Sequence, residues 1–208
     1  MENIIADDFR HGENLKLGHG IIIEPGVIVG DNVKIGHRVT LKSGTIVADN
    51  SIVDDHCITT GACYIGNNVN IRTGAIISKS TIIEDFAFIG PGVITNHTKH
   101  VPHGREESIS PKQLLTYIGF GAIIGSQASI LAGVFISDHV ILGGGSVVIK
   151  DLLVSGVYVG APARKIYEIP PEYDIRDKMI EIPAYNDNAL ISHMKKYISG
   201  LFIDKKFQ

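Results

Sequence analysis

The sequence predicts an all-β solenoid, in which short strands and corners alternate along most of the chain. The first observation is that Ile, Leu or Val recurs at every sixth position over residues 5–94 and again over residues 118–159. The second is that the fifth position of each six is mostly small, with Gly-containing polar pairs between. β-Branched residues favour an extended backbone and pack on a pleated surface, whereas Gly-containing polar pairs form turns. Each group of six residues, or hexad, is therefore expected to form one strand and one corner.

The repeat holds its phase through fifteen hexads before residue 95 and seven hexads after residue 117. The first position is Ile, Leu or Val in 20 of these 22 hexads, which excludes a chance pattern and identifies an internal repeat. The exceptions are His11, which we interpret as part of a frayed cap, and Thr59, for which we favour a local adjustment over a hydroxyl that faces a site. First and fifth side chains are both expected to point inward. The fifth-position residues Cys57 and Cys63 should therefore be buried, inert thiols.

The composition excludes several classes of function. The chain has 208 residues, 44% of them apolar, and its 19 basic and 22 acidic residues give a net charge of −3. Without a basic run, it lacks the positive surface that nucleic-acid binding requires. The first residues lack the features of a secretion signal, and no apolar segment reaches the ~20 residues that span a bilayer. We therefore expect a cytoplasmic protein whose partners include neither nucleic acid nor membrane.

One long polar insertion interrupts the repeat. Residues 95–117 break the six-residue period and contain three histidines, His97, His100 and His103. A long irregular segment in a regular scaffold is usually functional. We therefore expect one β-helix domain over residues 1–167, with this loop insertion as its functional part.

A tail of residues 168–208 follows the repeat. Between about residues 188 and 200 it carries Leu190, Met194 and Tyr197 at helical spacing. This spacing predicts a short amphipathic helix. We expect the tail to cover the last coil or a neighbouring subunit.

These features resemble a known family, the hexapeptide-repeat acyltransferases. The hexads follow its pattern of a branched apolar residue, glycine, two variable residues, a small residue and one further residue, over about two-thirds of the chain. The exit segment 158–166, Tyr-Val-Gly-Ala-Pro-Ala-Arg-Lys-Ile, is similar to the element that closes the β-helix in the coenzyme A-dependent members. The resemblance implies a left-handed parallel β-helix with three hexads, or eighteen residues, in each coil. The left hand comes from the resemblance alone, because the general crossover rule favours the right hand.

The same resemblance implies that acetyl-CoA, or another acyl-CoA, is the co-substrate and that no metal is needed. In the family the exit segment lies along the coenzyme, and Arg164 would offer charge-assisted hydrogen bonds to its phosphates. Since residues eighteen apart stack, Gly125, Gly143 and Ala161 are expected to form a ladder of small residues beside the pantetheine arm. The candidate coenzyme-binding residues are Gly125, Gly143, Gly160, Ala161, Arg164 and Lys165.

His97 is the candidate general base. It stands three residues beyond the last regular hexad, where the rigid coil would anchor it. An imidazole with a pKa near ~6.5 can accept the proton that is released when an amine or hydroxyl attacks a thioester. Its neighbour Asn96 could orient the nucleophile or hold the thioester carbonyl. Some family members that act on amino sugars have no protein base, and in that case His97 would bind the sugar instead; His100 and His103 are expected to be exposed.

The resemblance is closest to bacterial N-acetyltransferases that act on nucleotide-linked amino sugars. It rests on the segment 89–96, Ile-Gly-Pro-Gly-Val-Ile-Thr-Asn, before a long loop, and on the Val-Gly-Ala-Pro-Ala-Arg exit. It implies acyl transfer to the amine of a dTDP- or UDP-linked amino-deoxysugar in the biosynthesis of surface polysaccharides such as lipopolysaccharide. It also implies a homotrimer with each active site between two subunits. The candidate substrate contacts, three of them placed on outward corners near the insertion, are Arg72, Glu84, Asp85 and Thr95.

Three alternatives remain open from the sequence. O-acetyltransferases that act on serine, sugars or xenobiotics share the fold and the coenzyme. A carbonic-anhydrase-like metalloenzyme is disfavoured, because its His-X4-His pair is absent and the loop histidines follow one another at spacings of three. A non-enzymatic β-helix that serves as an assembly module is disfavoured by the long insertion and the intact exit segment.

Overall fold

The structure is a computed structural model that describes residues 2–101, 103–104 and 114–179. The chain divides into two compact units, residues 1–169 and residues 170–208. All strands of the described residues belong to the first of these units.

The second unit contains short helical turns. They are two 3-10 turns, η1 (Pro171–Tyr173) and η2 (Arg176–Met179). The amphipathic helix expected near residues 188–200 lies outside the described residues. Over the described ranges, no helix has the length and apolar character to cross a membrane.

The first unit contains twenty-four short strands in three sheets, which we name A, B and C. Sheet A contains β1 (Ile4–Ile5), β4 (Ile22–Ile23), β7 (Thr40–Leu41), β10 (Ile58–Thr59), β13 (Ile76–Ile77), β16 (Ile94–Thr95), β19 (Ser129–Ile130) and β22 (Val147–Val148). Sheet B contains β2 (Arg10–His11), β5 (Ile28–Val29), β8 (Ile46–Val47), β11 (Tyr64–Ile65), β14 (Thr81–Ile83), β17 (Thr116–Ile118) and β20 (Phe135–Ile136). Sheet C contains β3 (Lys16–Leu17), β6 (Lys34–Ile35), β9 (Ile52–Val53), β12 (Asn70–Ile71), β15 (Phe88–Ile89), β18 (Ile123–Ile124), β21 (Val140–Leu142), β23 (Gly156–Val159) and β24 (Arg164–Tyr167).

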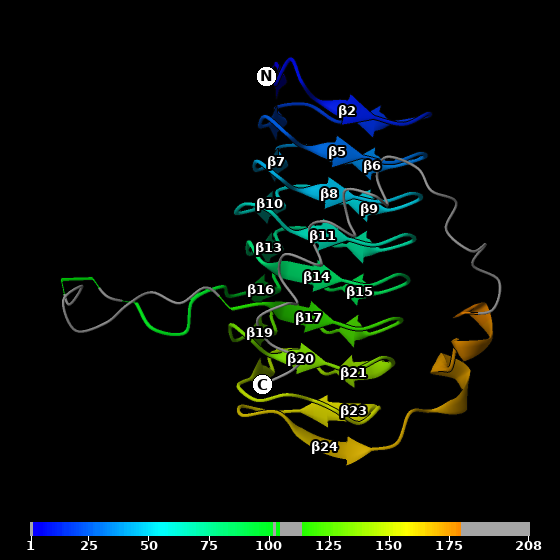
Figure 1. Cartoon of the computed structure of the whole chain (residues 1–208). Helices are drawn as coiled ribbons and strands as arrows, with labels where there is room; N and C mark the ends of the chain where they lie inside the picture. The colour runs from blue at the N-terminus through cyan, green and yellow to red at the C-terminus, as the bar shows by residue number, and fades with distance from the viewer. Residues whose placement is uncertain (1, 102, 105–113, 180–208) are drawn as a thin grey trace, which may run out of the picture. The chain divides into compact units, whose positions relative to one another are not determined.

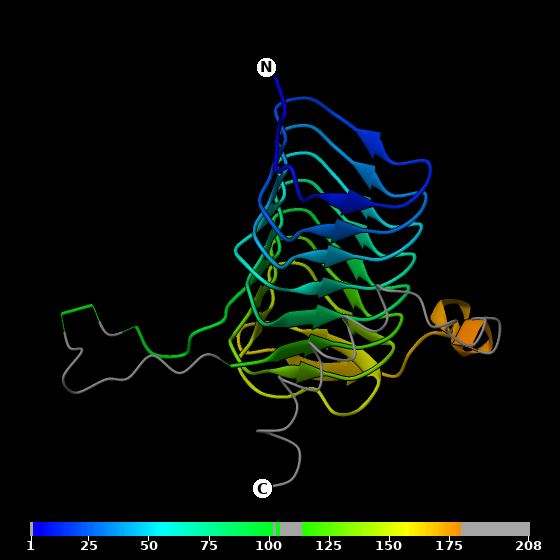
Figure 2. The same ribbon diagram turned by 45° about the horizontal axis from the view of Figure 1, so that its top comes forward.

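The chain winds through sheets A, B and C once in each coil (Figure 1, Figure 2). Strands of neighbouring coils pair in parallel, as in the pairing of Ile4 with Ile22 and of Ile65 with Ile83, eighteen residues apart. Each coil thereby satisfies backbone N–H and C=O groups of the next. The predicted parallel β-solenoid is confirmed, with the predicted length of eighteen residues for a regular coil.

The core is a column of first- and fifth-position side chains. The first-position residues Ile35 and Ile71 and the fifth-position residue Val69 are each at most 1% exposed. Cys57 and Cys63 lie in the same column, as predicted, and burial raises the pKa of their thiols to about 11 and about 12. Both thiols are therefore protonated at neutral pH, a state in which they are poor nucleophiles.

A ladder of side-chain oxygens stabilises the corner between sheets B and C. The carboxylate of Asp31 accepts a hydrogen bond from the N–H of Glu13 at 2.6 Å, and Asp49 accepts one from Asp31 at 2.8 Å. Asn67 and Asp85 continue the ladder, since Asp85 Oδ1 accepts the N–H of Asn67 at 2.7 Å. Partners lie one coil apart, so these side chains join successive turns where the strand pairing has ended.

The last coil is shorter than the hexads predict. Leu142 pairs with Tyr158, sixteen residues later. Val154, the predicted first position of the last hexad, is 59% exposed, whereas Leu152 is 5% exposed and pairs with Ile136 in its place. Strand β24 then folds back antiparallel onto β23. The predicted hexad 154–159 is therefore wrong, because the coil lacks two residues while branched residues continue the pattern in the sequence.

Candidate active site

The insertion leaves the solenoid at the corner between sheets A and B. Strand β16 precedes it and strand β17 follows it (Figure 1). At its start, the backbone N–H and the side-chain amide of Asn96 both donate to the carbonyl oxygen of Ile130, at 3.0 and 3.1 Å. An asparagine amide carries two hydrogens, and one of them is thus used to hold the side chain against the next coil. Asn96 is therefore an anchored side chain.

His97 is held in place by its backbone. Its carbonyl oxygen accepts a hydrogen bond from the N–H of Leu114 at 3.0 Å, so the start and the end of the insertion meet at this residue. The imidazole is half-buried. Burial, and to a smaller extent the ammonium group of Lys79 one coil earlier, lower the pKa of His97. The imidazole is therefore neutral at neutral pH, which is the state that a general base requires.

Replacing Lys79 with glutamine is expected to raise the pKa of His97. Removal of the nearby positive charge favours the imidazolium, so the acid limb of a pH profile that depends on neutral His97 should move to higher pH. The expected shift is below about one pH unit, because burial, the larger cause, remains. Profiles of kcat/KM against pH for the wild type and K79Q measure it.

The matched control for this prediction is Lys99→Gln. Lys99 is an exposed lysine of the insertion, and its removal changes the net charge by the same amount. We expect the K99Q profile to coincide with that of the wild type. An acid limb in K79Q that stays at the wild-type pH would show that Lys79 does not act on His97.

The other two histidines of the insertion, His100 and His103, are exposed, as predicted. Their imidazoles are thus more hydrated than that of His97. Within the part of the chain that the structure describes, no group of three or more His, Cys, Asp or Glu side chains is arranged to hold a metal ion.

Thr95 lies inside the corner and is only 1% exposed. Its hydroxyl accepts the N–H of Ser78 at 2.8 Å and lies 3.2 Å from the hydroxyl of Thr81. The hydroxyl of Ser78 in turn donates to the carbonyl oxygen of Thr95 at 2.6 Å. The expected contact of Thr95 with substrate is therefore corrected to a structural role beneath Asn96, because the hydroxyl is buried and already bonded.

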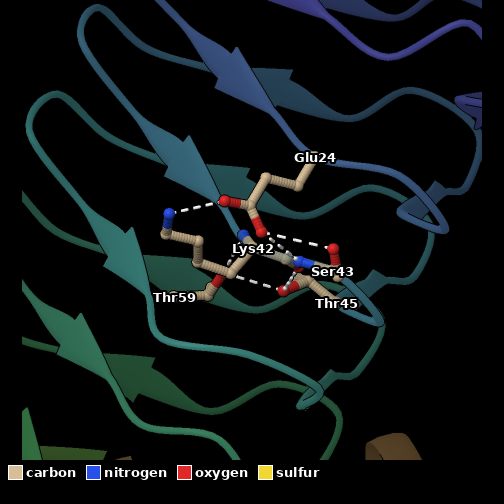
Figure 3. Close-up of polar contacts among 5 residues, drawn as sticks. All are labelled: Glu24, Lys42, Ser43, Thr45 and Thr59. Atoms are coloured by element: carbon tan, nitrogen blue, oxygen red, sulfur yellow. Dashed lines mark hydrogen bonds and ion pairs between the residues drawn. The ribbon is translucent and has the colours of Figure 1, made fainter.

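The same arrangement recurs two coils earlier at Thr59 (Figure 3). Thr59 Oγ1 accepts the N–H of Lys42 at 2.9 Å and lies 2.7 Å from the hydroxyl of Thr45. The carboxylate of Glu24 closes the network, since it pairs with the ammonium of Lys42 and accepts the N–H and the hydroxyl of Ser43. The threonine that breaks the hexad pattern thus satisfies a backbone donor at the corner, which confirms the local adjustment inferred from the sequence.

The remaining predicted residues share no corner with His97. The corner between B and C follows strand β14, and the corner between C and A follows strands β12, β18 and β21. By corner, the predicted residues are Asn96 and His97 between A and B, Glu84 and Asp85 between B and C, and Arg72, Gly125 and Gly143 between C and A. One subunit therefore presents the candidate residues on three separate edges of the column.

Arg72 and Asp85 have partners within the column. Arg72 Nε lies 3.1 Å from Asp54 Oδ2, although the Arg72 side chain remains 45% exposed. Asp85 is 5% exposed, and its carboxylate accepts hydrogen bonds from the backbone and the side-chain amide of Asn67. The expected sugar contact of Asp85 is thereby corrected to a place in the corner ladder. The cause is that an outward corner residue becomes buried when the next coil stacks on it.

Glu84 is a partly buried carboxyl group at a position where the preceding coil has Gly66. Burial, and to a smaller extent repulsion by Asp85, raise the pKa of Glu84 to about 7, although a hydrogen bond from the hydroxyl of Tyr117 acts in the opposite direction. The ring of Tyr117 stacks on that of Phe135, with centroids 4.5 Å apart and an angle of 6° between the planes. The sequence analysis named Glu84 as a substrate contact but did not anticipate its raised pKa. The signal for it was the glutamate in place of glycine.

Gly125 and Gly143 stack in successive coils, as predicted. A Cβ atom on Gly125 would lie 2.6 Å from the carbonyl oxygen of Leu142, so the spacing of the coils itself requires glycine. A Cβ atom on Gly143 would lie 2.8 Å from Cγ1 of Val159. Because the last coil is short, Val159 occupies the place predicted for Ala161, and the predicted ladder is wrong at its last member.

Gly160 and Ala161 form the turn between β23 and β24. Gly160 has a φ of 94°, in the left-handed region that favours glycine. Its N–H donates to Ser146 Oγ at 3.1 Å, and its carbonyl oxygen accepts the N–H of Val147 at 3.0 Å. The turn is thus fixed to the preceding coil, while Ala161 is exposed.

The exit segment lines a cavity of about 210 Å³ at the last coil. Its walls include three basic side chains, those of Lys150, Arg164 and Lys165. Lys165 Nζ lies 2.8 Å from both carboxylate oxygens of Glu168, which neutralises part of its charge. Arg164 donates to the carbonyl oxygen of Ala163 at 2.9 Å and is exposed. Asp151 also lines the cavity, but the three basic side chains outnumber it and suit an anionic group such as a phosphate.

Comparisons with solved structures give the same fold. The N-acyltransferase AntD from Bacillus cereus, in a mutant form crystallised with dTDP and coenzyme A, is 22% identical, over 83% of this chain and 90% of AntD, with a TM-score of 0.57. LpxA, the UDP-N-acetylglucosamine O-acyltransferase of Moraxella catarrhalis, is 17% identical, over 99% of this chain and 84% of LpxA, with a TM-score of 0.58. The polySia-specific acetyltransferase NeuO is 18% identical, over 92% of this chain and 100% of NeuO, with a TM-score of 0.50. These structural neighbours are hexapeptide-repeat acyltransferases, the proteins that the sequence resembles.

Sequence comparisons identify the family. No curated protein matches the chain. The family model described as the GMPPB C-terminal domain matches residues 5–115, which include the first fifteen hexads and most of the insertion. Because this match takes in more than half of the 208 residues, the chain belongs to the family of the GMPPB C-terminal domain.

Proposed function

We propose that the protein is an acyl-CoA-dependent N-acyltransferase that transfers an acyl group, in the first instance acetyl, to the amine of a dTDP- or UDP-linked amino-deoxysugar. The observation that carries the proposal is the neutral, partly buried imidazole of His97, fixed where the insertion leaves an acyltransferase-type solenoid. The substrate class is supported by AntD, which was crystallised with coenzyme A and either dTDP or dTDP-4-amino-4,6-dideoxyglucose.

In the proposed reaction, the sugar amine attacks the thioester carbonyl and forms a tetrahedral intermediate. His97 accepts the proton that the attacking nitrogen loses, directly or through one water molecule. The carbon–sulfur bond then breaks, the amide is released, and the coenzyme thiolate takes a proton to leave as the free thiol. Asn96 lies beside this centre, and its anchored amide would position the acceptor or the carbonyl.

The coenzyme would use the edge between sheets C and A. The backbone there is free of side chains at Gly125 and Gly143, and the basic cavity of the exit segment follows at the last coil. An extended pantetheine arm along this edge would end with its phosphates near Arg164 and Lys165. The coenzyme edge and His97 lie on different corners of one column, so a complete site would need a second subunit.

We propose a homotrimer with the active sites between subunits. The outer face of sheet A supports this assembly, because it carries a row of exposed isoleucines that includes Ile22, Ile58 and Ile94, between 38% and 41% exposed. Thr40 stands between Ile22 and Ile58 in this row, and exposed apolar side chains gathered on one face mark an interaction surface. Ile94 closes the hexad before Asn96 and His97, so a second copy that covers this row would lie next to His97.

O-acetylation is the second candidate. It is favoured by the same neutral imidazole, because a hydroxyl nucleophile depends on a general base more strongly than an amine does. NeuO, whose fold the chain shares, is an acetyltransferase specific for polySia. The acceptor therefore decides between the two candidates.

A free-thiol release assay with acetyl-CoA tests the proposal. The acceptor panel contains dTDP- and UDP-linked amino-deoxysugars, with serine and chloramphenicol as O-acceptors. We expect acceptor-dependent thiol release with at least one amino sugar and none with the same sugar after its amine has been blocked. Release with the O-acceptors alone would replace the proposal by O-acetylation. No acetyl-CoA binding in calorimetry would favour a non-enzymatic assembly module.

A further inference from the structure

A hydroxyl–carbonyl hydrogen bond closes the corner from which the insertion emerges. In an uninterrupted corner, Thr45 Oγ1 donates to the carbonyl oxygen of Lys42, three residues earlier, at 2.7 Å. At the interrupted corner, Thr116 Oγ1 donates to the carbonyl oxygen of Asn96, twenty residues earlier, at 3.2 Å. The two bonds join equivalent positions of the coil, because Thr116 pairs with Thr81 and Thr81 lies two coils after Thr45. The insertion is therefore looped out of an otherwise ordinary corner.

The hydroxyl of Thr116 is held from a second side. Its oxygen accepts the N–H of Gly133, one coil later, at 3.2 Å. The backbone N–H of Thr116 donates to the carbonyl oxygen of Ser80 at 2.9 Å, and the residue is 0% exposed. A buried hydroxyl that both donates and accepts has its orientation set by the surrounding backbone. Thr116 can therefore transmit the position of two neighbouring coils to Asn96.

A second contact lies one step further out, between His97 and Leu114. The N–H of Leu114 donates to the carbonyl oxygen of His97 at 3.0 Å. The side chain of Leu114 lies against Gly133, where a Cβ atom would come within 3.0 Å of Leu114 Cβ. The returning chain is thus seated on the next coil, and His97 is tied to it. We call these two contacts, Thr116 with Asn96 and Leu114 with His97, the neck of the insertion.

We propose that Thr116 is a positioning residue for His97. Its hydroxyl, through the hydrogen bond to the carbonyl oxygen of Asn96, holds the two chain segments of the neck together and thereby fixes the position of the imidazole. This inference rests on the proposed function, in which His97 is the base. Loss of the hydroxyl would leave the carbonyl of Asn96 and the N–H of Gly133 without this partner, and the neck would open more often. A base displaced by a fraction of an ångström loses much of the advantage of proximity.

The experiment compares the wild type with three variants. T116V keeps the shape of the side chain and removes the hydroxyl, whereas T116S keeps the hydroxyl. T45V is the matched control, because Thr45 is also 0% exposed and makes the same bond in a corner without an insertion. Two readouts are independent of activity: hydrogen exchange of the Leu114 amide and the titration midpoint of the His97 imidazole, both by NMR. The third readout is kcat and KM for thiol release.

In T116V we expect the Leu114 amide to exchange at least about tenfold faster, since its partner His97 belongs to the opened neck. The titration midpoint of His97 should rise towards ~6.5, because an opened neck reduces its burial. We expect kcat to fall about tenfold, with KM for acetyl-CoA within about twofold of the wild type. T116S should restore all three values, and T45V should leave them unchanged.

Two results would overturn the inference. One is an unchanged Leu114 exchange rate and His97 midpoint in T116V. The other is the same change in T45V, which would mean that any corner threonine loosens the column. Should T116V fail to fold, Thr116→Ala gives the same comparison with less crowding. If the wild type releases no thiol with any acceptor, the proposed function fails. Hydrogen exchange of the Leu114 amide and titration of the His97 imidazole would still show whether the Thr116 hydroxyl positions His97.

Discussion

Replacing His97 with alanine is expected to lower kcat for acyl transfer by about 10²–10⁴-fold. The reason is that His97 is the one partly buried histidine among the described residues of the insertion, and burial lowers its pKa. A neutral base fixed by the neck accepts the proton as the tetrahedral intermediate forms, and alanine leaves this proton to bulk water. The measurement is steady-state thiol release at saturating acetyl-CoA, with the acceptor that gives the largest rate in the panel.

His100→Ala is the control for this prediction. His100 is exposed, lies three residues from His97 in the same insertion, and should leave kcat within about twofold when removed. A decrease in kcat of less than about threefold in H97A would show that His97 is not the general base. The proton would then be taken up by the departing sulfur or by the substrate, and His97 would be left with a binding role that raises KM.

Replacing Glu84 with glutamine is expected to make the protein less sensitive to pH between about 4.5 and 7. Burial, followed by repulsion from Asp85, raises the pKa of Glu84 from 4.5 to about 7 in the folded protein. Between these two pH values Glu84 is protonated in the folded protein and ionised in the unfolded protein. The contribution of Glu84 to stability is therefore fully present below pH 4.5 and is lost as the pH rises through 7.

The glutamine side chain stays neutral and can still bond to Tyr117, so E84Q keeps that contribution. We expect E84Q to match the wild type near pH 4.5 and to exceed it near pH 8 by about 2 kcal/mol, after allowance for partial exposure of the carboxyl group. Urea unfolding of both proteins at several pH values measures the difference. Parallel curves for the two proteins across this range would contradict the raised pKa.

Glu24→Gln is the matched control, because Glu24 has the opposite shift. The hydrogen bond from Lys42, followed by that from Ser43, lowers the pKa of Glu24. Its contribution to stability is thus present above pH 4.5 and is lost as the pH falls through the lowered folded-state pKa. E24Q should therefore differ from the wild type more at pH 8 than at pH 3, and in the destabilising direction.

The sequence was sufficient for the regular coils, and it failed where a coil changes length. A branched residue at every sixth position can be read without coordinates, since the side chain must fill the column and the backbone must stay extended. Val154 continues this pattern and yet is exposed, because Leu152, sixteen residues after Ile136, takes the place predicted for it. The pairing of Ile136 with Leu152 decides which residue points inward, and a pattern of neighbouring residue types does not reveal a contact between coils.

The candidate site, too, could be predicted only in part from the sequence. Asn96 and His97 could be located from the sequence because they directly follow an unbroken repeat, and the structure places them at the neck. Thr95 and Asp85 were expected to contact substrate; Thr95 instead takes an inward strand position in register with Ile130, and Asp85 is buried in the corner ladder beside Asn67. Whether a corner side chain meets water or the following coil depends on a residue eighteen positions away.

The sequence by itself therefore determined the solenoid and the place of the insertion, because both follow from local periodicity, whereas the parallel, eighteen-residue coil was implied by the family resemblance. Three features came from the tertiary structure alone. Thr116 bonds to Asn96, twenty residues earlier; the pKa of Glu84 is raised to about 7; and Val159 takes the place of Ala161 beside Gly143. These features arise from contacts between coils, and their energies depend on burial and distance. A linear pattern of residue types carries neither quantity.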